Sequence, residues 1–342
     1  MLVASLTRIH SEMGHTSRVV AINPCEENFK PVIKRQGEDG VDWIAPKKTL
    51  GRLSRSLFIK KHADKFSPDV TFAHSVIPSA YARIACARNV ISVLHSETNY
   101  EAGYVRFAEK LLQYKLAGVI SVSEDARLNY SKNYSKPPSR HIFNGISLSD
   151  LKNNSAHGKS IRESLGIKAA DYVVVQIGRV DPVKQQHLSL AAMIPVIKNN
   201  RAVHLLLAGL IEDDSYQTSL KQTARYAGVE SNVHFLGPRN DVPDLLSAAD
   251  LFLMPSRRES QGIAMIEALA SGLPIIASPI GGLQWAERFE GVTLLPAENL
   301  ERFTSAIRAT LKQRLRYDRD LHGFDIRDTA MAYITFAEEC TS

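Results

Sequence analysis

The chain alternates between short, continuously apolar runs and longer segments in which apolar residues recur three or four positions apart. Runs such as residues 90–94 and 250–254 are typical of strands that are buried on both faces of a parallel sheet. The spaced pattern, seen for example in residues 2–13, predicts amphipathic helices. The two patterns follow one another in regular order, which predicts parallel sheets covered by helices.

The individual elements follow from the same patterns. We predict strands at residues 18–23, 69–73, 90–94, 118–122, 141–143, 171–177, 204–208, 233–235, 250–254, 275–277 and 291–295. We predict helices at residues 2–13, 47–65, 78–87, 101–116, 184–197, 215–227, 242–247, 262–273, 300–315 and 328–339, and a further helix that begins after Ser123.

Polar residues 151–159 separate two βα series and predict a linker. We therefore expect two Rossmann-like α/β domains, residues 1–150 and 151–322, with a central ligand cleft. Residues 323–342 predict a C-terminal helix that can pack back on the first domain. A doubly wound domain normally begins with a strand and a glycine-rich turn, whereas this chain begins on a helix. We therefore expect the first strand to be missing, because it lies before Met1 or because the domain is built differently.

The second series contains one strand, turn, helix and strand unit that places two carboxylates around a glycine. Glu259 lies in the loop at the carboxyl end of a strand, where open α/β sheets bind ligands, and Glu267 lies on the following helix. The first helical amides, near Gly262 and Ile263, can hold an anion. This arrangement suits a polyhydroxyl compound that carries phosphate. A helix with two solvated glutamates is an equally good interpretation of the spacing alone.

Composition narrows the class of protein. The chain has 342 residues, of which 44% are hydrophobic and 23% charged, as in soluble globular proteins with room for two domains. It contains no run of about 18 apolar residues that would span a membrane, and its start lacks the apolar core of a signal peptide. The three cysteines lie far apart, which favours inert thiols in a reducing cytoplasm over a disulfide framework or a metal site.

The net charge of +6 is modest, but part of it is concentrated in residues 47–65, which hold a single acid, Asp64. The basic residues of this segment are Lys47, Lys48, Arg52, Arg55, Lys60, Lys61 and Lys65. On a helical wheel Leu50, Leu53 and Leu57 share one side. The segment resembles a basic helix that can lie against anionic lipid or a phosphorylated substrate, and a solvated outer face is an equally good interpretation. Nucleic acid is a weaker candidate, because no interleaved aromatic residues or binding module are present.

Two further cations follow a strand in the second series. Gly178 and Arg179 end the strand at residues 171–177, and Lys184 lies in the loop that follows. Arg179 can grip a phosphate through paired N–H groups and Lys184 adds a second charge, so a diphosphate can be held without metal. Taken singly, each is better interpreted as a surface cation. Residues 318–320 have the Asp-x-Asp form of a metal-binding motif, but they fall in a charged, helix-like stretch that we interpret as surface.

These motifs in their order resemble the GT-B glycosyltransferases of family 4. The resemblance is carried by residues 178–184, 235–237 and 249–256, by Glu259 with Glu267 eight positions later, and by Pro274 with Gly281 and Gly282. Weaker matches in the first half are His74 with Ser75, His95, residues 122–124 and residues 143–145. No Gly-x-Gly-x-x-Gly follows a strand, which argues against a nicotinamide-dependent dehydrogenase.

The resemblance implies a retaining, metal-independent transfer of a sugar from a UDP- or GDP-sugar to a hydroxyl of a glycan or lipid-linked acceptor. It implies cell-envelope polysaccharide or lipopolysaccharide synthesis in the cytoplasm, at the inner face of the membrane, with no cofactor besides the donor. The first domain would bind the acceptor and the second the donor. By motif position the reacting groups would be Glu259, Arg179, Lys184 and His95, and the donor would also contact Glu267, Gly262, Ile263 and Gly178.

Two alternatives remain open at this point. A catalytically silent GT-B protein that binds a glycan or another transferase would fit the missing first strand. A sugar-nucleotide epimerase of similar fold would turn the donor over without an acceptor.

Overall fold

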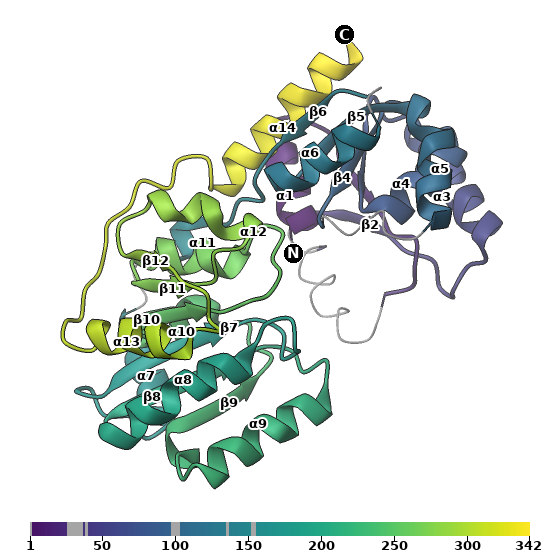
Figure 1. The fold of residues 1–342 in the computed structure, drawn as a ribbon. Coiled ribbons are helices and arrows are strands. Elements are labelled where there is room, and N and C mark those ends of the chain that lie inside the picture. The colour runs from purple at the N-terminus through teal and green to yellow at the C-terminus, as the bar shows by residue number, and fades with distance from the viewer. Residues whose placement is uncertain (1, 26–36, 38–39, 97–102, 135–136, 152–154) are drawn as a thin grey trace. The chain divides into compact units, whose positions relative to one another are not determined.

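The computed structural model describes residues 2–25, 37, 40–96, 103–134, 137–151 and 155–342 (Figure 1). The chain divides into two compact units. Unit 1 comprises Met1–Ile146 together with His322–Ser342, and unit 2 comprises Ser147–Leu321. Each unit is an α/β assembly with its own parallel sheet.

Unit 2 is built on one six-stranded sheet whose neighbouring strands all run parallel. Its strands are β7 (Tyr172–Ile177), β8 (Val203–Ala208), β9 (Val233–Gly237), β10 (Leu251–Met254), β11 (Ile275–Ala277) and β12 (Val292–Leu294). They lie in the order β12-β11-β10-β7-β8-β9. The strand order therefore reverses between β7 and β10. In open α/β sheets this switch point is where ligands bind, at the carboxyl ends of the strands.

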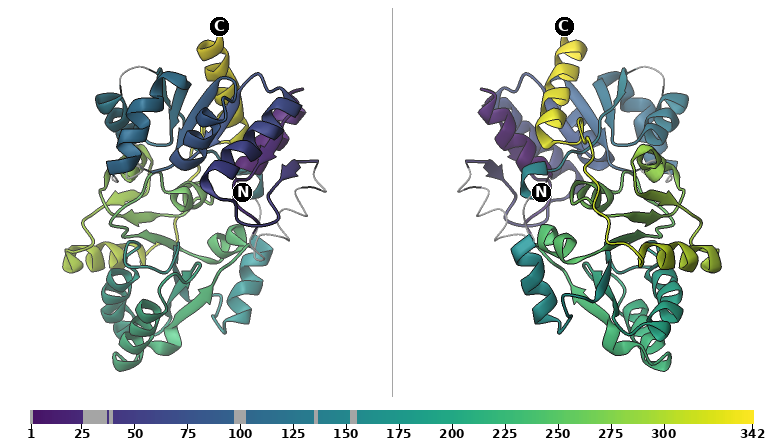
Figure 2. Two further views of the ribbon diagram at one scale, coloured as in Figure 1. Left: turned by 90° about the vertical axis from the view of Figure 1, so that its right-hand side faces the viewer. Right: turned by 90° about the vertical axis from the view of Figure 1, so that its left-hand side faces the viewer.

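Helices cover this sheet on both sides (Figures 1 and 2). They are α7 (Ser155–Ser164), α8 (Gln186–Asn199), α9 (Asp214–Tyr226), α10 (Val242–Ala248), α11 (Ile263–Ala270), α12 (Gly281–Gln284) and α13 (Leu300–Thr310), with 3-10 turns η4 (Leu148–Leu151), η5 (Glu230–Asn232) and η6 (Trp285–Arg288). Leu190, Leu220 and Phe303 of α8, α9 and α13 pack with Leu205 in one buried cluster. The large apolar area buried there supplies the main stabilisation of the unit.

Unit 1 contains two parallel sheets among its described residues. β1 (Arg18–Val20) pairs with β2 (Asp42–Ile44), and the larger sheet has the order β3-β4-β5-β6. Its strands are β3 (Thr71–His74), β4 (Val90–Leu94), β5 (Leu116–Ser121) and β6 (Ser139–His141). Its helices are α1 (Leu2–Glu12), α3 (Arg52–Phe66), α4 (Val76–Ile84), α5 (Gly103–Leu112), α6 (Glu124–Asn133) and α14 (Ile326–Thr341), with η3 (Gln113–Lys115).

The last helix, α14, belongs to unit 1 and lies beside α1 (Figure 1). Leu6 and Ile9 of α1 and Tyr333 and Phe336 of α14 are buried in one cluster with Ile91 of β4. Both helices therefore cover the same face of the larger sheet. The first and last elements of the chain close one core.

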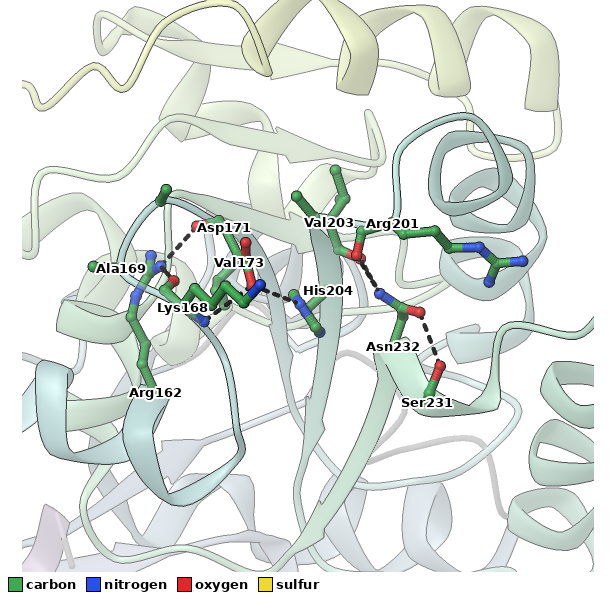
Figure 3. A network of polar contacts seen from close by, with 12 residues as sticks. Arg162, Lys168, Ala169, Asp171, Val173, Arg201, Val203, His204, Ser231 and Asn232 are labelled. Atoms are coloured by element: carbon green, nitrogen blue, oxygen red, sulfur yellow. Dashed lines mark hydrogen bonds and ion pairs between the residues drawn. The ribbon is translucent and has the colours of Figure 1, made fainter.

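The edge of the unit 2 sheet where the strands begin carries a polar network (Figure 3). His204 Nε2 lies 3.3 Å from Asp171 Oδ2, and its Nδ1 lies 3.2 Å from His234 Nε2. Arg162 donates to the Asp171 carbonyl at 2.7 Å, and Asn232 donates to the Val203 carbonyl at 3.1 Å. Burial, reinforced by His204, lowers the pKa of His234 to about 4. These contacts join neighbouring strands at the edge opposite to the one where ligands are expected.

Several predicted elements are wrong in detail. Residues 151–159 are not an irregular linker in their described part, because η4 ends at residue 151 and α7 begins at residue 155. Gly158 lies in the predicted linker, but a Cβ there would collide with Ser247, so this glycine allows α7 to pack closely on α10. The strand predicted at 141–143 corresponds to β6, which begins two residues earlier. The strand β2 was not predicted, because it is short and has an exposed Asp42.

The helix predicted at 300–315 ends at Thr310, and the segment around residues 318–320 is not helical. Arg314, Arg316 and Arg319 instead donate to backbone carbonyls of unit 2 and hold this segment in an extended path. Asp318 is exposed, as predicted. The start of the helix predicted at 101–116 and most of the irregular region after Cys25 lie outside the described residues. Across the described residues, none of the helices has both the length and the apolar character needed to cross a bilayer.

Candidate functional site

The site is built at the carboxyl end of β10, beside the switch point of the unit 2 sheet. The chain leaves β10, passes through Glu259 and enters α11 at Gly262, which has a φ of 72°. Only glycine adopts this left-handed conformation without strain, and a Cβ here would also meet Leu283. A second close approach holds the loop, because a Cβ at Gly282 would collide with the Glu259 carbonyl oxygen. The two glycines thus set the path of the loop.

Lys184 and Glu259 form an ion pair in this loop region. Lys184 Nζ donates to Glu259 Oε1 at 2.5 Å, and Ser256 Oγ donates to the same oxygen at 2.8 Å. The exposed fractions of the lysine and glutamate side chains are 15% and 9%. Two residues that are 75 positions apart are therefore brought together at one point.

The loop that carries Lys184 is fixed at both ends. Asp181 Oδ1 accepts from the Lys184 amide at 2.9 Å, and Gln176 Nε2 donates to the Lys184 carbonyl at 2.7 Å. The Arg257 amide donates to the Val183 carbonyl at 2.9 Å, which ties this loop to the one after β10. Gly178 precedes it, and a Cβ there would lie 3.6 Å from the Lys184 side chain. The lysine is therefore held in place before any ligand binds.

Arg179 lies on the more open side of the site. Its Nη1 donates to Glu212 Oε2 at 2.6 Å, and its Nη2 lies 3.6 Å from Asp181 Oδ2. The Arg179 side chain is 53% exposed, and its hydrogen bond to Glu212 raises the pKa of the guanidinium. Arg179 is thus a permanent cation that is already paired with an anion of the protein.

Glu267 is on α11, in a markedly less polar environment. Burial raises the pKa of its carboxyl to about 7, so its charge changes near neutral pH. At the start of the same helix, the amides of Met265 and Ile266 donate to the Gly262 carbonyl. The helix's own bonds therefore begin at Met265, and helix geometry leaves the Ile263 amide available to an anion. The side chain of Ile263 is exposed.

His95, the remaining predicted site residue, belongs to unit 1 and directly follows β4. Its Nε2 lies 2.9 Å from His74 Nδ1, the two rings stack, and Tyr333 stacks on His74. Burial, with the neighbouring His95, lowers the pKa of His74 to about 3, and burial also lowers the pKa of His95. Both imidazoles are therefore neutral at neutral pH. His95 can hydrogen-bond a ligand but offers no positive charge to a phosphate.

Sequence reasoning missed three residues that shape the site. Ser256 is buried and donates to Glu259, Asp181 fixes the Lys184 amide, and Glu212 pairs with Arg179. Ser256 and Asp181 lie within the motifs that carry the family resemblance, but a role was predicted only for neighbouring residues. Glu212 lies in the loop after β8, and no residue spacing connects it to Arg179.

The described residues contain no cluster of three or more histidine, cysteine, aspartate or glutamate side chains arranged to hold a metal ion. The two cations of the site are both paired, Lys184 with Glu259 and Arg179 with Glu212 and, at longer distance, Asp181. A ligand with a diphosphate could exchange partners with both cations. Hydroxyl groups of the same ligand could donate to Glu259 once Lys184 has released it.

Comparison with solved structures defines the fold class. The chain superposes on a cyanobacterial protein, Anabaena Alr3699/HepE in complex with UDP-glucose, with a TM-score of 0.76 and 20% identity, covering 99% of this chain and 93% of that one. It also superposes on a glycosyltransferase from Rickettsia africae with a TM-score of 0.83 and 14% identity, covering 99% and 94%. The protein therefore has the GT-B glycosyltransferase fold, with two Rossmann-like domains.

Comparison with protein families then identifies the chain more closely. A family described as "Glycosyltransferase Family 4" matches residues 1–150, and one described as "Glycosyl transferases group 1" matches residues 171–313. The chain belongs to the group 1, or family 4, glycosyltransferases.

Among curated proteins the chain is similar to the lipopolysaccharide glucosyltransferase WaaG of Escherichia coli, with 28% identity over 221 residues. That match covers 63% of this chain and 56% of WaaG. It is also similar to an alpha-monoglucosyldiacylglycerol synthase of Streptococcus pneumoniae, with 30% identity over 178 residues, or 51% of this chain and 40% of that protein. The matched part thus spans about half the length of these relatives.

Proposed function

We propose that the protein is a retaining, metal-independent glycosyltransferase that moves a sugar from a UDP- or GDP-sugar to a hydroxyl of a glycan or lipid-linked acceptor. The observation that carries the proposal is the Lys184–Glu259 pair, whose Nζ and Oε1 atoms are 2.5 Å apart at the switch point of the sheet. Arg179 lies on the loop that carries Lys184. Unit 2 would bind the donor and unit 1 the acceptor. The donor class is supported by the neighbour that binds UDP-glucose.

The chemistry assigns a role to each residue of the proposed site. Cleavage of the bond between the sugar and the diphosphate puts negative charge on the leaving diphosphate. Arg179 and Lys184 would neutralise it, helped by the amides of Gly262 and Ile263 at the start of α11. Because these groups are preorganised, they can lower the barrier without a metal.

The two carboxylates would bind the hydroxyl groups of the donor. Glu259, released from Lys184 by the diphosphate, would accept hydrogen bonds from the sugar, and Glu267 would accept them from the ribose. Gly178 lets the donor approach the backbone closely. His95, as a neutral imidazole, would hydrogen-bond the sugar.

The acceptor class is proposed from the relatives, which act in lipopolysaccharide and glycolipid synthesis by name. We therefore propose that the enzyme works in the cytoplasm on cell-envelope polysaccharide or lipopolysaccharide precursors. Two helices of unit 1 support a peripheral contact with the inner face of an anionic membrane. Both expose apolar side chains next to cations.

The first of these helices is α3, which covers most of the basic segment 47–65. Leu53 is 80% exposed and Leu57 is also exposed, and the cations Lys60 and Lys61 are exposed on the same helix. The predicted apolar side of this helix thus faces solvent and not the core. Exposed leucines among cations suit the boundary between anionic headgroups and acyl chains.

The second helix, α5, exposes apolar side chains and buries an acidic one, which is the reverse of the usual pattern in a surface helix. Its exposed side carries Tyr104, Phe107 and Leu111 with Lys110, whereas its acid, Glu109, is buried. Glu109 accepts from Arg83 at 2.6 Å and from Tyr130 at 2.8 Å, which fastens α5 to α4 and α6. A helix held by a buried ion pair with aromatic side chains outward can present them to a lipid surface.

The enzymatic proposal is tested by a donor screen. Purified protein is incubated with common UDP- and GDP-sugars, with and without EDTA, and release of UDP or GDP is measured. We expect turnover with one donor, unchanged by EDTA and stimulated by a glycan or glycolipid acceptor. Failure of every nucleotide sugar to bind contradicts the proposal, and conversion of the donor to an isomer without acceptor indicates an epimerase.

The membrane contact is tested separately by sedimentation with vesicles of phosphatidylglycerol or of phosphatidylcholine. We expect binding to the first and not the second, and a loss of binding of about tenfold in the Phe107→Ser/Leu111→Ser double variant. The matched control is Tyr226→Ser, which removes an aromatic side chain that is 87% exposed on unit 2. Equal binding by all three proteins contradicts a role for α5.

A further inference from the structure

One acid at the candidate site has no role in the proposed chemistry. Glu212, in the loop between β8 and α9, accepts a hydrogen bond from Arg179 Nη1 at 2.6 Å. Both side chains are substantially exposed, so the pair can open without disturbing the core. The cation that would stabilise the leaving diphosphate is therefore occupied when no donor is bound.

The backbone around this pair is fixed. The Val180 amide donates to the Leu210 carbonyl at 2.8 Å, and the Glu212 amide donates to the Val180 carbonyl at 3.3 Å. Gln186 Nε2 donates to the Arg179 carbonyl at 2.7 Å. These bonds place the Glu212 side chain next to Arg179, while the two charged ends remain free to change partners.

The second cation of the site shows why Glu212 is different. Lys184 is paired with Glu259, which itself is proposed to bind the donor, so the opening of that pair supplies a ligand to the sugar. Glu212 is outside the family motif and gains no such partner when Arg179 turns to a diphosphate. Its charge only opposes the arrival of another anion at the same guanidinium.

We propose that Glu212 is an internal counter-anion that holds the guanidinium of Arg179 until the diphosphate of a nucleotide donor displaces it. The inference rests on the proposed function, because it assumes that Arg179 binds the diphosphate. Glu212 is a positioning residue that acts through Arg179. It lowers the affinity of the site for nucleoside diphosphates and receives the arginine back when the product leaves.

The expected size of the effect follows from the exposure of the pair. Solvent-exposed ion pairs are worth at most about 1 kcal/mol, which corresponds to roughly fivefold in affinity. Removal of the competing charge should therefore strengthen diphosphate binding about two- to fivefold. The removal should stabilise the bound donor and the transition state equally. KM for the donor should therefore fall by this factor while kcat stays unchanged.

The test is a double-mutant cycle read by calorimetric titration with UDP and with GDP. The proteins are the wild type, Glu212→Gln, Arg179→Ala and the variant with both changes. Glu301→Gln is the matched control, because Glu301 is an exposed acid at the start of α13 in the same unit. Thermal melting confirms that each variant is folded.

We expect Glu212→Gln to tighten UDP or GDP binding two- to fivefold, Glu301→Gln to leave it unchanged, and Glu212→Gln to have no effect once Arg179 is alanine. Weaker binding by Glu212→Gln would show that Glu212 helps the ligand, and unchanged binding would show that it does not compete. Either result overturns the inference while leaving the proposed function intact. If the wild type binds neither nucleotide, the proposed function and this inference fail together.

Discussion

The two units share one architecture but place their ion pairs in different parts of it. In unit 2 the pairs Lys184–Glu259 and Arg179–Glu212 lie in the loops at the carboxyl edge of the sheet. In unit 1 the most buried pair, Arg83 with Glu109, lies beneath helix α5 with both side chains 1% exposed. Charges in loops can exchange partners with a ligand, whereas charges under a helix can only hold the helix in place.

The corresponding strand end in unit 1 carries no such cations among its described residues. His95 directly follows β4 and pairs with His74, and burial keeps both rings neutral. Among the described residues, the end of β4 thus offers neutral imidazoles, whereas the end of β10 offers a paired cation. A neutral, hydrogen-bonding site suits hydroxyl groups of a sugar. The comparison teaches that strand ends in two α/β units of one chain can carry very different charge.

The largest expected effect concerns the buried pair of unit 1. Glu109→Gln leaves Arg83 as an uncompensated buried charge, so the free energy of unfolding should fall by about 3–5 kcal/mol. Urea unfolding measures the loss. The Arg83→Met/Glu109→Leu double variant should recover most of it. UDP or GDP binding by unit 2 should be unchanged in the folded protein, and a parallel loss of binding would break the comparison between the units.

The next effect concerns the exchangeable cation of unit 2. Arg179→Ala should lower the transfer rate about a hundredfold, close to 3 kcal/mol, by analogy with the loss of one oxyanion donor. Stability should change little because Arg179 is exposed. Arg201→Ala is the control, since Arg201 is an exposed cation just before β8, at the opposite edge of the sheet. A similar rate loss in both variants would contradict a specific role for Arg179.

A smaller effect is expected in the pH dependence of stability. The pKa of His74 is lowered to about 3 and that of His234 to about 4. Below pH 6.5 the unfolded chain therefore binds protons that the folded protein does not. The free energy of unfolding should fall by about 1–2 kcal/mol per histidine as the pH drops from 6.5 toward 4, and stay level above 7.5.

Denaturant titrations at a series of pH values measure the slope of the free energy of unfolding against pH. His74→Gln should reduce the slope for unit 1 and His234→Gln for unit 2, which would assign to these two histidines their share of the acid sensitivity. Stability that rises on acidification in this range would contradict the assignment.

The smallest effect concerns Glu267, whose pKa is raised to about 7. If ribose hydroxyls donate to the ionised carboxylate, donor affinity should fall as the pH drops below 7. Between pH 8 and 6 the fall should reach about tenfold at most, because one pKa unit is worth about 1.4 kcal/mol. Titration with a nucleotide sugar measures it. Glu267→Gln should remove the pH dependence, whereas Glu259→Gln should weaken binding and keep it.

Much of unit 2 could be predicted from the sequence, because its signals are local. The apolar run of β10, the spacing of α11 and the glycine between them predict one βαβ unit, and the structure confirms it. Parallel strands bring their carboxyl ends to one edge, so the meeting of Lys184 and Glu259 could also be expected.

The remaining features depend on contacts that leave no local pattern. The position of Glu212 beside Arg179 is set by backbone bonds between two loops, which residue spacing does not encode. The glycine at 158 looked like a linker residue but serves close packing of two helices. Leu53 and Leu57 share a side as predicted, yet apolar periodicity alone does not say whether that side meets a core or solvent.

Gly282 has a consequence for how this protein can change over generations. Any side chain at position 282 would collide with the carbonyl of Glu259. As long as the site is needed, natural selection should therefore remove variants that lack glycine at this position. Arg257 is engaged through its backbone, and its side chain, like that of Arg258, points into solvent. Substitutions at these two arginines meet no such collision, so the loop can change its exposed charges while position 282 has to remain glycine.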